Sequence, residues 1–255
     1  MSVQSSSRAA SAVTGTDLAG VTVRDLQKAL VFYRDTLGMQ PSVVSENGAE
    51  FHLADGTTFG LWQPPESENM APGFGLMFSV GDAAASAQAV RERGGEISEP
   101  FESPVCYMAM GKDSEGNTLI VHQKKSTDEH KPSRQARTLT TINGIDMAGY
   151  FVTDPQRAID FYRDVLGLTP TEITPGRGSE FELADGSTFG VWSMPDNRRG
   201  GFVMFAVDSV RAKAAELRSR GVELSDVTET PNCFMAFGPD PEGTAVILHQ
   251  RKGHG

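Results

Sequence analysis

The chain has 255 residues, with 33 acidic and 23 basic side chains and a formal net charge of −10 at pH 7. This acidic balance argues against binding to a phosphate backbone or an anionic membrane, because both need a basic face. No run approaches the roughly 18 apolar residues that span a bilayer, and the N-terminus lacks the apolar core of a secretion signal, so we expect a cytoplasmic protein.

One stretch occurs twice: FYRDTLGM at 32–39 returns as FYRDVLGL at 161–168. Apolar residues at three- and four-residue steps predict that each copy closes an amphipathic helix. The aspartate seven residues before each copy is the expected N-cap (Asp25 and Asp154), and the glycine inside the copy supplies the left-handed stop. A repeat of this length indicates two related halves in one chain.

The first half reads as two successive β-α-β-β-β units. Residues 1–16 are rich in Ser and Ala and predict a disordered tail. Strands are expected at 18–23, 42–44, 49–54 and 57–62, the last two joined by the hairpin signal Asp55-Gly56. The pattern then restarts with strands at 75–80, 106–112 and 118–123, a helix from Asp82, and a final turn, Asp113-Ser114-Glu115-Gly116, suited to a type I turn with a bulge.

The second half repeats this order after a charged, polar linker at 125–143. Strands are expected at 148–152, 188–192 and 202–207, with helices starting at Asp154 and Asp208 and hairpins at Asp185-Gly186 and 240–243. The whole chain is therefore predicted to consist of four related modules.

Four such modules, marked by the helix ending FYRD-x-LG and the turn D-x-E-G, resemble the vicinal oxygen chelate superfamily. That superfamily includes glyoxalase I, extradiol dioxygenases and bleomycin-resistance proteins. The resemblance implies an α+β fold in which four βαβββ modules form two domains, whose curved mixed sheets enclose cavities. The expected domains are 17–124 (modules 17–65 and 73–124) and 144–252 (modules 144–195 and 200–252). Modules pair in sequence order or exchange partners, and the sequence leaves both arrangements open.

The same resemblance implies where an enzyme of the superfamily holds its metal. The ligands are usually a His at the start of a module's first strand and a Glu on its last strand; the corresponding residues here are Leu18, Gly75, Met147 and Gly201, and Gly60, Ile120, Gly190 and Ile247. A divalent ion needs three or four N, O or S ligands at about 2.0–2.6 Å, which these side chains do not supply. We therefore expect no metal. The alternative is Zn, Ni or Fe held by displaced ligands around His122 and His249, two positions beyond the Glu site.

Period-two alternation predicts eight ligand-binding residues. A two-residue Asp55-Gly56 turn would pair Phe51 with Gly60, on the face that carries Trp62. His122 provides a polar group able to act as acid or base, with Met108 on the same face across a bulged hairpin. Each has a counterpart in the second half, so the predicted set is Phe51, Trp62, Met108, His122, Phe181, Trp192, Met235 and His249. The alternative is that the aromatic and methionine side chains simply fill a core.

Two further pairs of residues recur in both halves but are not predicted to belong to a ligand-binding site. Cys106 and Cys233 each stand alone in their half, which argues against a disulfide, and no cation nearby in the sequence would activate them. Glu50 and Glu180 are expected on the face opposite the tryptophans, in a salt link or in solvent.

The leading functional hypothesis is metal-independent binding of a small hydrophobic or planar molecule, similar to sequestration by bleomycin-resistance proteins. The alternatives are a metal-dependent lyase, isomerase or dioxygenase, and metal-free catalysis by His122 or His249, which would need a second polar group within hydrogen-bond reach. The expected partner is a small molecule rather than nucleic acid or membrane, and the expected state is monomer or homodimer.

Overall fold

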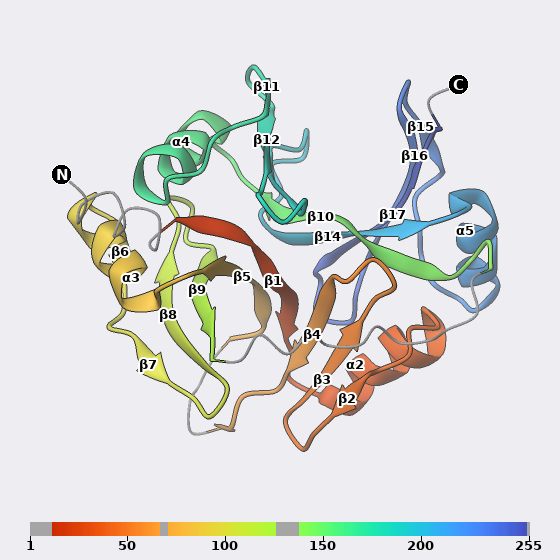
Figure 1. The fold of residues 1–255 in the computed structure, drawn as a ribbon. Coiled ribbons are helices and arrows are strands. Elements are labelled where there is room, and N and C mark those ends of the chain that lie inside the picture. Colours follow the sequence, from red (N-terminus) through yellow and green to blue (C-terminus); the bar gives the residue numbers. More distant parts are fainter. Residues whose placement is uncertain (1–11, 67–70, 126–137, 254–255) are drawn as a thin grey trace. The chain divides into compact units, whose positions relative to one another are not determined.

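A computed structural model describes residues 12–66, 71–125 and 138–253 (Figure 1). It confirms the α+β fold of four βαβββ modules, which we number 1 to 4 along the chain. Module 1 consists of β1 (Val13–Thr22), α2 (Leu26–Leu30), the π-helix η1 (Val31–Thr36), β2 (Val43–Val44), β3 (Gly48–His52) and β4 (Thr58–Trp62). Module 2 consists of β5 (Gly73–Val80), α3 (Ala83–Glu92), β6 (Glu96–Ile97), β7 (Phe101–Glu102), β8 (Cys106–Lys112) and β9 (Thr118–Lys124).

The second half repeats this order. Module 3 consists of β10 (Ile142–Phe151), α4 (Pro155–Asp160), the π-helix η3 (Phe161–Val165), β11 (Glu172–Thr174), β12 (Gly178–Glu182) and β13 (Thr188–Trp192). Module 4 consists of β14 (Gly200–Val207), α5 (Val210–Ser219), β15 (Thr228–Glu229), β16 (Cys233–Pro239) and β17 (Ala245–Arg251). The strand orders of the two mixed sheets are β2-β3-β4-β1-β5-β9-β8-β6, with β7 also on β8, and β11-β12-β13-β10-β14-β17-β16-β15.

The caps and stops predicted for the two copies of the repeated helix are confirmed. The Asp25 carboxylate accepts from Lys28 N and the Asp154 carboxylate from Arg157 N, each at 3.0 Å. Gly38 ends the first copy with φ 75°, as the left-handed stop requires. The π-helical second half of each helix was not predicted, and Leu37 N bonds Phe32 O, five residues back, at 2.8 Å. Helix α5 also differs, because Ser209 rather than Asp208 caps it.

The hairpin register predicted for modules 1 and 3 was wrong by one residue. Leu53 N bonds Thr57 O at 2.9 Å and Gly56 N bonds Leu53 O at 3.0 Å, so the loop has three residues, with Gly56 at φ 91°. Phe51 consequently pairs with Phe59, and Glu50 pairs with Gly60. The D-x-E-G turns have the same three-residue form, and there the bulge was predicted; Met108 therefore faces His122 as expected.

The predicted tail and linker are shorter than expected where the structure describes them. Residues 1–11 and 126–137 lie outside the described residues, but β1 begins at Val13 and β10 at Ile142. Hydrogen bonds from distant parts of the chain hold the start of β1: Thr14 Oγ1 donates to Ser79 O at 3.2 Å and Thr16 N to Asp185 Oδ2 at 3.1 Å. The composition of residues 1–16 could not reveal these partners, because they are distant in the sequence.

Two compact units divide the chain, and each takes one module from each half. Unit 1 comprises Met1–Leu18, Gly75–Glu129 and Gly149–Gly200, and therefore modules 2 and 3; unit 2 comprises Ala19–Phe74, His130–Ala148 and Gly201–Gly255, and therefore modules 1 and 4. The first part of β1 belongs to unit 1, and the first part of β10 to unit 2. The modules that share a unit have thus exchanged partners relative to sequence order.

A buried tyrosine–aspartate hydrogen bond joins the two modules of each unit. In unit 2 the hydroxyl of Tyr33, from the first FYRD helix, donates to Asp240 Oδ2 at 2.8 Å; in unit 1 Tyr162 donates to Asp113 Oδ2 at 2.9 Å. Both tyrosines are fully buried, and burial raises their pKa well above the ordinary value, as does the nearby aspartate. Burial also raises the pKa of Asp240, against the hydrogen bonds that it accepts. The two repeated motifs of the sequence therefore bond to each other, helix to turn.

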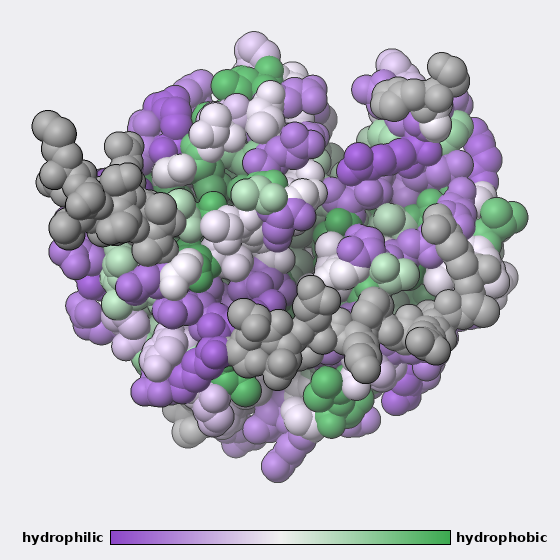
Figure 2. Space-filling view, viewed as in Figure 1, coloured by the Kyte–Doolittle hydropathy of each residue, from purple (hydrophilic) through white to green (hydrophobic). Residues whose placement is uncertain are grey.

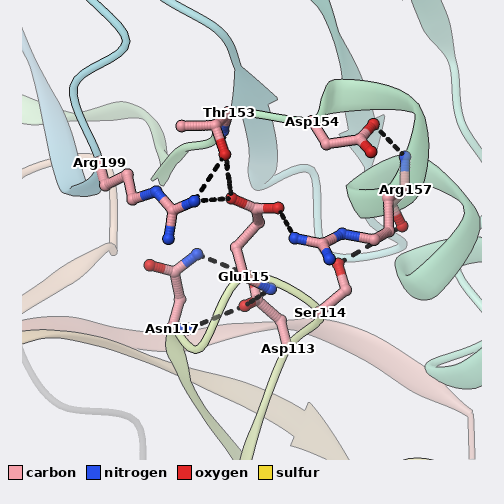
Figure 3. Close-up of polar contacts among 8 residues, drawn as sticks. All are labelled: Asp113, Ser114, Glu115, Asn117, Thr153, Asp154, Arg157 and Arg199. Atoms are coloured by element: carbon pink, nitrogen blue, oxygen red, sulfur yellow. Dashed lines mark hydrogen bonds and ion pairs between the residues drawn. The ribbon is translucent and has the colours of Figure 1, made fainter.

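The glutamate of each D-x-E-G turn strengthens the same junction. Glu115 lies at the centre of the contacts in Figure 3, where its carboxylate accepts from Thr153 Oγ1 at 2.8 Å, pairs with Arg157, and lies 3.6 Å from Arg199. Burial would raise the pKa of Glu115, but the hydrogen bonds from Arg157 and Thr153 hold it below its ordinary value. In unit 2 the corresponding Glu242 accepts from Arg24 N at 2.9 Å.

Helices cover one face of the strands in each module: α2 packs against β4, α3 against β8 and β9, α4 against β12 and β13, and α5 against β16 and β17. None of the helices within the described residues is long and apolar enough to cross a membrane. The face of the molecule seen in Figure 2 is mainly hydrophilic, with hydrophobic side chains in small separate groups.

Removing one tyrosine hydroxyl is expected to destabilise its unit. Tyr33→Phe removes the hydroxyl donor of Asp240 Oδ2, and Tyr162→Phe removes one of the two donors of Asp113 Oδ2, whose other donor is Asn117 Nδ2. Each variant is therefore expected to lower the free energy of unfolding by about 1–3 kcal/mol, with the larger loss for Tyr33→Phe. Urea unfolding measures the loss, and Tyr107→Phe, at a half-buried strand residue, is the matched control with a smaller effect. Equal stability of Tyr33→Phe and the native protein would contradict a structural role for this bond.

Substitution of either of two glycines is expected to destabilise the protein, because a turn carboxylate occupies the space that a Cβ atom would need. A Cβ on Gly15 would lie 1.8 Å from Asp185 Oδ2, and one on Gly144 would lie 1.7 Å from Asp55 Oδ2. Gly15→Ala and Gly144→Ala should therefore each lower the free energy of unfolding by about 1–3 kcal/mol. Urea unfolding measures this loss as a lower midpoint. Gly73→Ala is the control, since its Cβ would meet nothing within 4 Å. A Gly15→Ala protein as stable as Gly73→Ala would show that the carboxylate moves freely.

Candidate functional site

His122 lies on β9, on the strand face opposite the one that carries the buried core. Its cross-strand neighbours are Met108 on β8 and Ser79 on β5, so all three side chains share one face. Phe78 and Val121, one position along each strand, are fully buried on the other face. His122 is 8% exposed. The register therefore confirms the predicted face for His122 and Met108.

An aspartate anchors this histidine. Asp17, on the first part of β1, places Oδ2 2.7 Å from His122 Nδ1. Lys124, two residues after the histidine, places Nζ 2.6 Å from the other carboxylate oxygen, Oδ1. Burial would raise the pKa of Asp17, but the hydrogen bonds to His122 and Lys124 outweigh it and lower the pKa below its ordinary value. Asp17 is therefore a carboxylate at neutral pH, with both oxygens engaged.

Unit 2 carries the same arrangement. Asp146 Oδ2 lies 2.6 Å from His249 Nδ1, and Arg251 Nε lies 3.0 Å from Asp146 Oδ1. Met235 is the cross-strand neighbour of His249, as predicted, and Ala206 is the neighbour on β14. Burial would raise the pKa of Asp146, but the hydrogen bond to His249 and the nearby arginine lower it. We call each such trio an Asp–His site: Asp17, His122 and Lys124 in unit 1, and Asp146, His249 and Arg251 in unit 2.

In both sites Nε2 of the imidazole remains accessible. Every fully buried side-chain nitrogen or oxygen of the described residues has a hydrogen-bond partner. Within the same residues no partner is found for Nε2 of His122 or His249. An imidazole held at Nδ1 and open at Nε2 can accept or donate one hydrogen bond, or move a proton, at a fixed position.

Sequence analysis missed the two aspartates, although a signal was present. Residues 17–20 read DLAG and residues 146–149 read DMAG, eight residues before each helix cap. The superfamily pattern directed attention to the next residue, Leu18 or Met147, and the histidine partner lies more than 100 residues away. Only the pairing of strands brings the repeated Asp and the repeated His together.

Phe51 and Phe181 do not lie where they were predicted. The one-residue register shift turns Phe51 onto the face of Phe59, where its ring centroid lies 6.5 Å from that of Tyr33 and its side chain is fully buried. Phe181 likewise pairs with Phe189 and lies 6.0 Å from Tyr162. Both rings belong to the apolar core between helix and sheet rather than to the face that carries the tryptophans.

Trp62 and Trp192 lie at the ends of β4 and β13, on strands other than those of the histidines. Trp62 is 43% exposed, and its ring covers Gly48: a Cβ there would lie 3.5 Å from the indole Cε3. The register places Glu50 on the face of Trp62 rather than on the opposite face as predicted, and Glu180 pairs with Gly190 in the same way. Glu50 also lies 3.1 Å from His52 Nε2. The role of the tryptophans in binding remains a prediction.

The cysteines have a cationic neighbour that the sequence did not reveal. Cys106 is the cross-strand partner of Lys124, and Cys233 is that of Arg251. Each cation is engaged by an aspartate, however, and each sulfur lies against a hydroxyl, at 2.9 Å from Ser103 Oγ and 3.1 Å from Thr230 Oγ1. This arrangement favours structural thiols.

The donor atoms of the Asp–His sites do not fit a divalent metal ion. No group of three or more His, Cys, Asp or Glu side chains suited to a metal occurs in the described ranges. In each site a cationic nitrogen pairs with the second carboxylate oxygen, at 2.6 Å for Lys124 and 3.0 Å for Arg251, and a metal bound there would have to displace it. The side chains of the two Asp–His sites therefore suit a hydrogen-bonded ligand better than a metal ion.

Comparison with solved structures identifies the fold. The chain is similar to the Mn(II)-bound glyoxalase from Novosphingobium aromaticivorans (17% identity, TM-score 0.67, covering 94% of this chain and 82% of that one). It is also similar to homoprotocatechuate 2,3-dioxygenase from Arthrobacter globiformis (16% identity, TM-score 0.70, covering 96% of this chain and 82% of that one). A third similar structure is 2,2',3-trihydroxybiphenyl 1,2-dioxygenase from Sphingomonas wittichii strain RW1 (17% identity, TM-score 0.63, covering 95% of this chain and 93% of that one). At such low identity these likenesses concern the fold alone.

Comparison of the sequence itself gives the family. No curated protein matches the chain at a significant level. The model of the Glyoxalase/Bleomycin resistance protein/Dioxygenase superfamily matches residues 15–121 and again residues 144–248. Both halves, and with them most of the chain, are covered by this family model. The protein therefore belongs to the Glyoxalase/Bleomycin resistance protein/Dioxygenase superfamily.

Proposed function

We propose that the protein binds small molecules that combine an apolar body with one polar group, at one Asp–His site in each compact unit. The observation that carries this proposal is the accessible Nε2 of an aspartate-anchored histidine on a face shared with methionine. Sequestration of the bleomycin-resistance kind, without chemical change, is the simplest use of such a site.

The surroundings of each histidine support an apolar ligand. Ile120 and Met110 are cross-strand partners on the His122 face, and Ile247 and Phe237 are partners on the His249 face. Methionine adapts to irregular ligand shapes and makes favourable contacts with aromatic rings. One polar group in an apolar wall orients a ligand, because a misplaced polar atom there loses its hydrogen bond.

A second candidate function is metal-free proton transfer. It is favoured by the aspartate at hydrogen-bond distance from Nδ1, which is the second polar group that an imidazole base needs. In such a step the Nε2 lone pair takes a proton from an acidic C–H bond, whose electrons move onto the ligand. Incubation of a bound ligand in D2O separates the candidates: deuterium at carbon, lost in the histidine variants, indicates catalysis, and unchanged ligand indicates binding alone.

Truncation of either histidine is expected to weaken one site of two. After a fluorescence-detected thermal screen has identified a ligand, isothermal titration should give two sites per chain. His122→Ala and His249→Ala should each lower the affinity of one site about five- to thirtyfold, as expected for loss of a hydrogen bond worth about 1–2 kcal/mol. His52→Gln, at a buried histidine outside both sites, is the control. Unchanged affinity in the double variant would refute the proposed site.

Divalent metals are expected to leave the protein unchanged. Protein purified without a His-tag should contain metal well below one ion per chain, and addition of Zn²⁺, Ni²⁺ or Mn²⁺ should not raise the unfolding temperature. The reason is that a metal at either aspartate would have to displace Lys124 or Arg251. Near-stoichiometric metal by elemental analysis, lost in His122→Ala and His249→Ala, would instead support the metal-dependent alternative.

A further inference from the structure

The fixed proton position on each histidine determines which ligands the sites accept. Nδ1, not Nε2, faces the aspartate in both units, at 2.7 Å in unit 1 and 2.6 Å in unit 2. An ionised carboxylate can only accept a hydrogen bond, so Nδ1 carries a proton. The state of Nε2 then depends on whether the imidazole is neutral or charged.

The carboxylate in each site is shared between the imidazole and a cation. Lys124 and Arg251 already supply one positive charge to the aspartate, at 2.6 Å and 3.0 Å from its second oxygen. A neutral imidazole with its proton on Nδ1 has a lone pair at Nε2, and Nε2 is therefore a hydrogen-bond acceptor.

We propose that both Asp–His sites select ligands that offer a hydrogen-bond donor, such as a hydroxyl, on an apolar body. This inference rests on the proposed binding function and names its ligand class. A ligand with only ether or carbonyl oxygens would set an acceptor against the Nε2 lone pair. The methionine and isoleucine side chains on the same face suit an apolar body.

The aspartates provide a way to reverse this preference. In Asp17→Asn the Lys124 ammonium would continue to donate to the amide oxygen, because the amide NH2 cannot accept from it. The NH2 would then face Nδ1 and donate to it, which moves the imidazole proton to Nε2. The variant site should therefore prefer a ligand that accepts a hydrogen bond. Asp146→Asn is the matched variant for His249.

The first measurement is the tautomer itself, by two-bond 1H–15N NMR of the imidazoles in the full chain. The native protein is expected to show His122 and His249 protonated at Nδ1, with Nε2 unprotonated. Asp17→Asn should shift the proton to Nε2 in His122 only, and Asp146→Asn should do so in His249 only, so each variant contains its own reference site. A native protein with Nε2 protonated in both histidines would overturn the inference, and it would do so even if neither variant folded.

The second measurement compares benzyl alcohol with benzyl methyl ether, which have the same ring and differ in the donor. Native protein should bind the alcohol at least about fivefold more tightly, the equivalent of one net hydrogen bond, and Asp17→Asn should reverse the order at the first site. Equal affinities would overturn the donor preference while leaving the binding function standing. Failure of both probes to perturb either histidine would count against the binding function as well.

Discussion

The hydrogen bond between a buried tyrosine and a buried aspartate is the constraint on which the assembly of each unit depends. Tyr33 meets Asp240 and Tyr162 meets Asp113, so the FYRD helix of one half is always bonded to the D-x-E-G turn of the other. The same aspartates accept backbone N–H groups of their own turns, Glu242 N and Thr244 N for Asp240. The carboxylate thus closes the turn and holds the helix at once, and separating the modules would break this bond between helix and turn.

The turns and the sites are connected through the first strand of each half. Asp185 holds the start of β1 and Asp55 holds the start of β10, through Thr16 N and Ile145 N. These strand segments carry Asp17 and Asp146, which reach His122 and His249. A hairpin turn of one module therefore fixes the aspartate that orients the histidine of another module in the same unit. The repeated glycines beside these aspartates make room for the turn carboxylates.

Local signals allowed most of the fold to be predicted, and the failures have two physical causes. Helix caps, glycine stops and hairpin dipeptides act within a few residues, and Asp25, Gly38 and Asp154 lie where their types predicted. Phe51 was misplaced because Asp-Gly suits both two- and three-residue loops, and one extra residue reverses every side chain. Asp17 was missed because its partner lies 105 residues away. The acidic residue, the histidine and the cation are all visible in the sequence, but their proximity depends on strand pairing.

The exchange of modules between the halves also has a consequence for a single half of the chain expressed on its own. A single half contains one FYRD tyrosine whose aspartate lies in the other half, and one turn aspartate whose tyrosine does too. Expressed alone, a half could satisfy both groups as they are satisfied here by pairing with a second copy through a twofold, self-complementary contact. The polypeptide is then equivalent to a homodimer whose subunits have been joined end to end. The connecting segment replaces a concentration-dependent association with an intramolecular one, and it frees the two histidine sites to diverge independently.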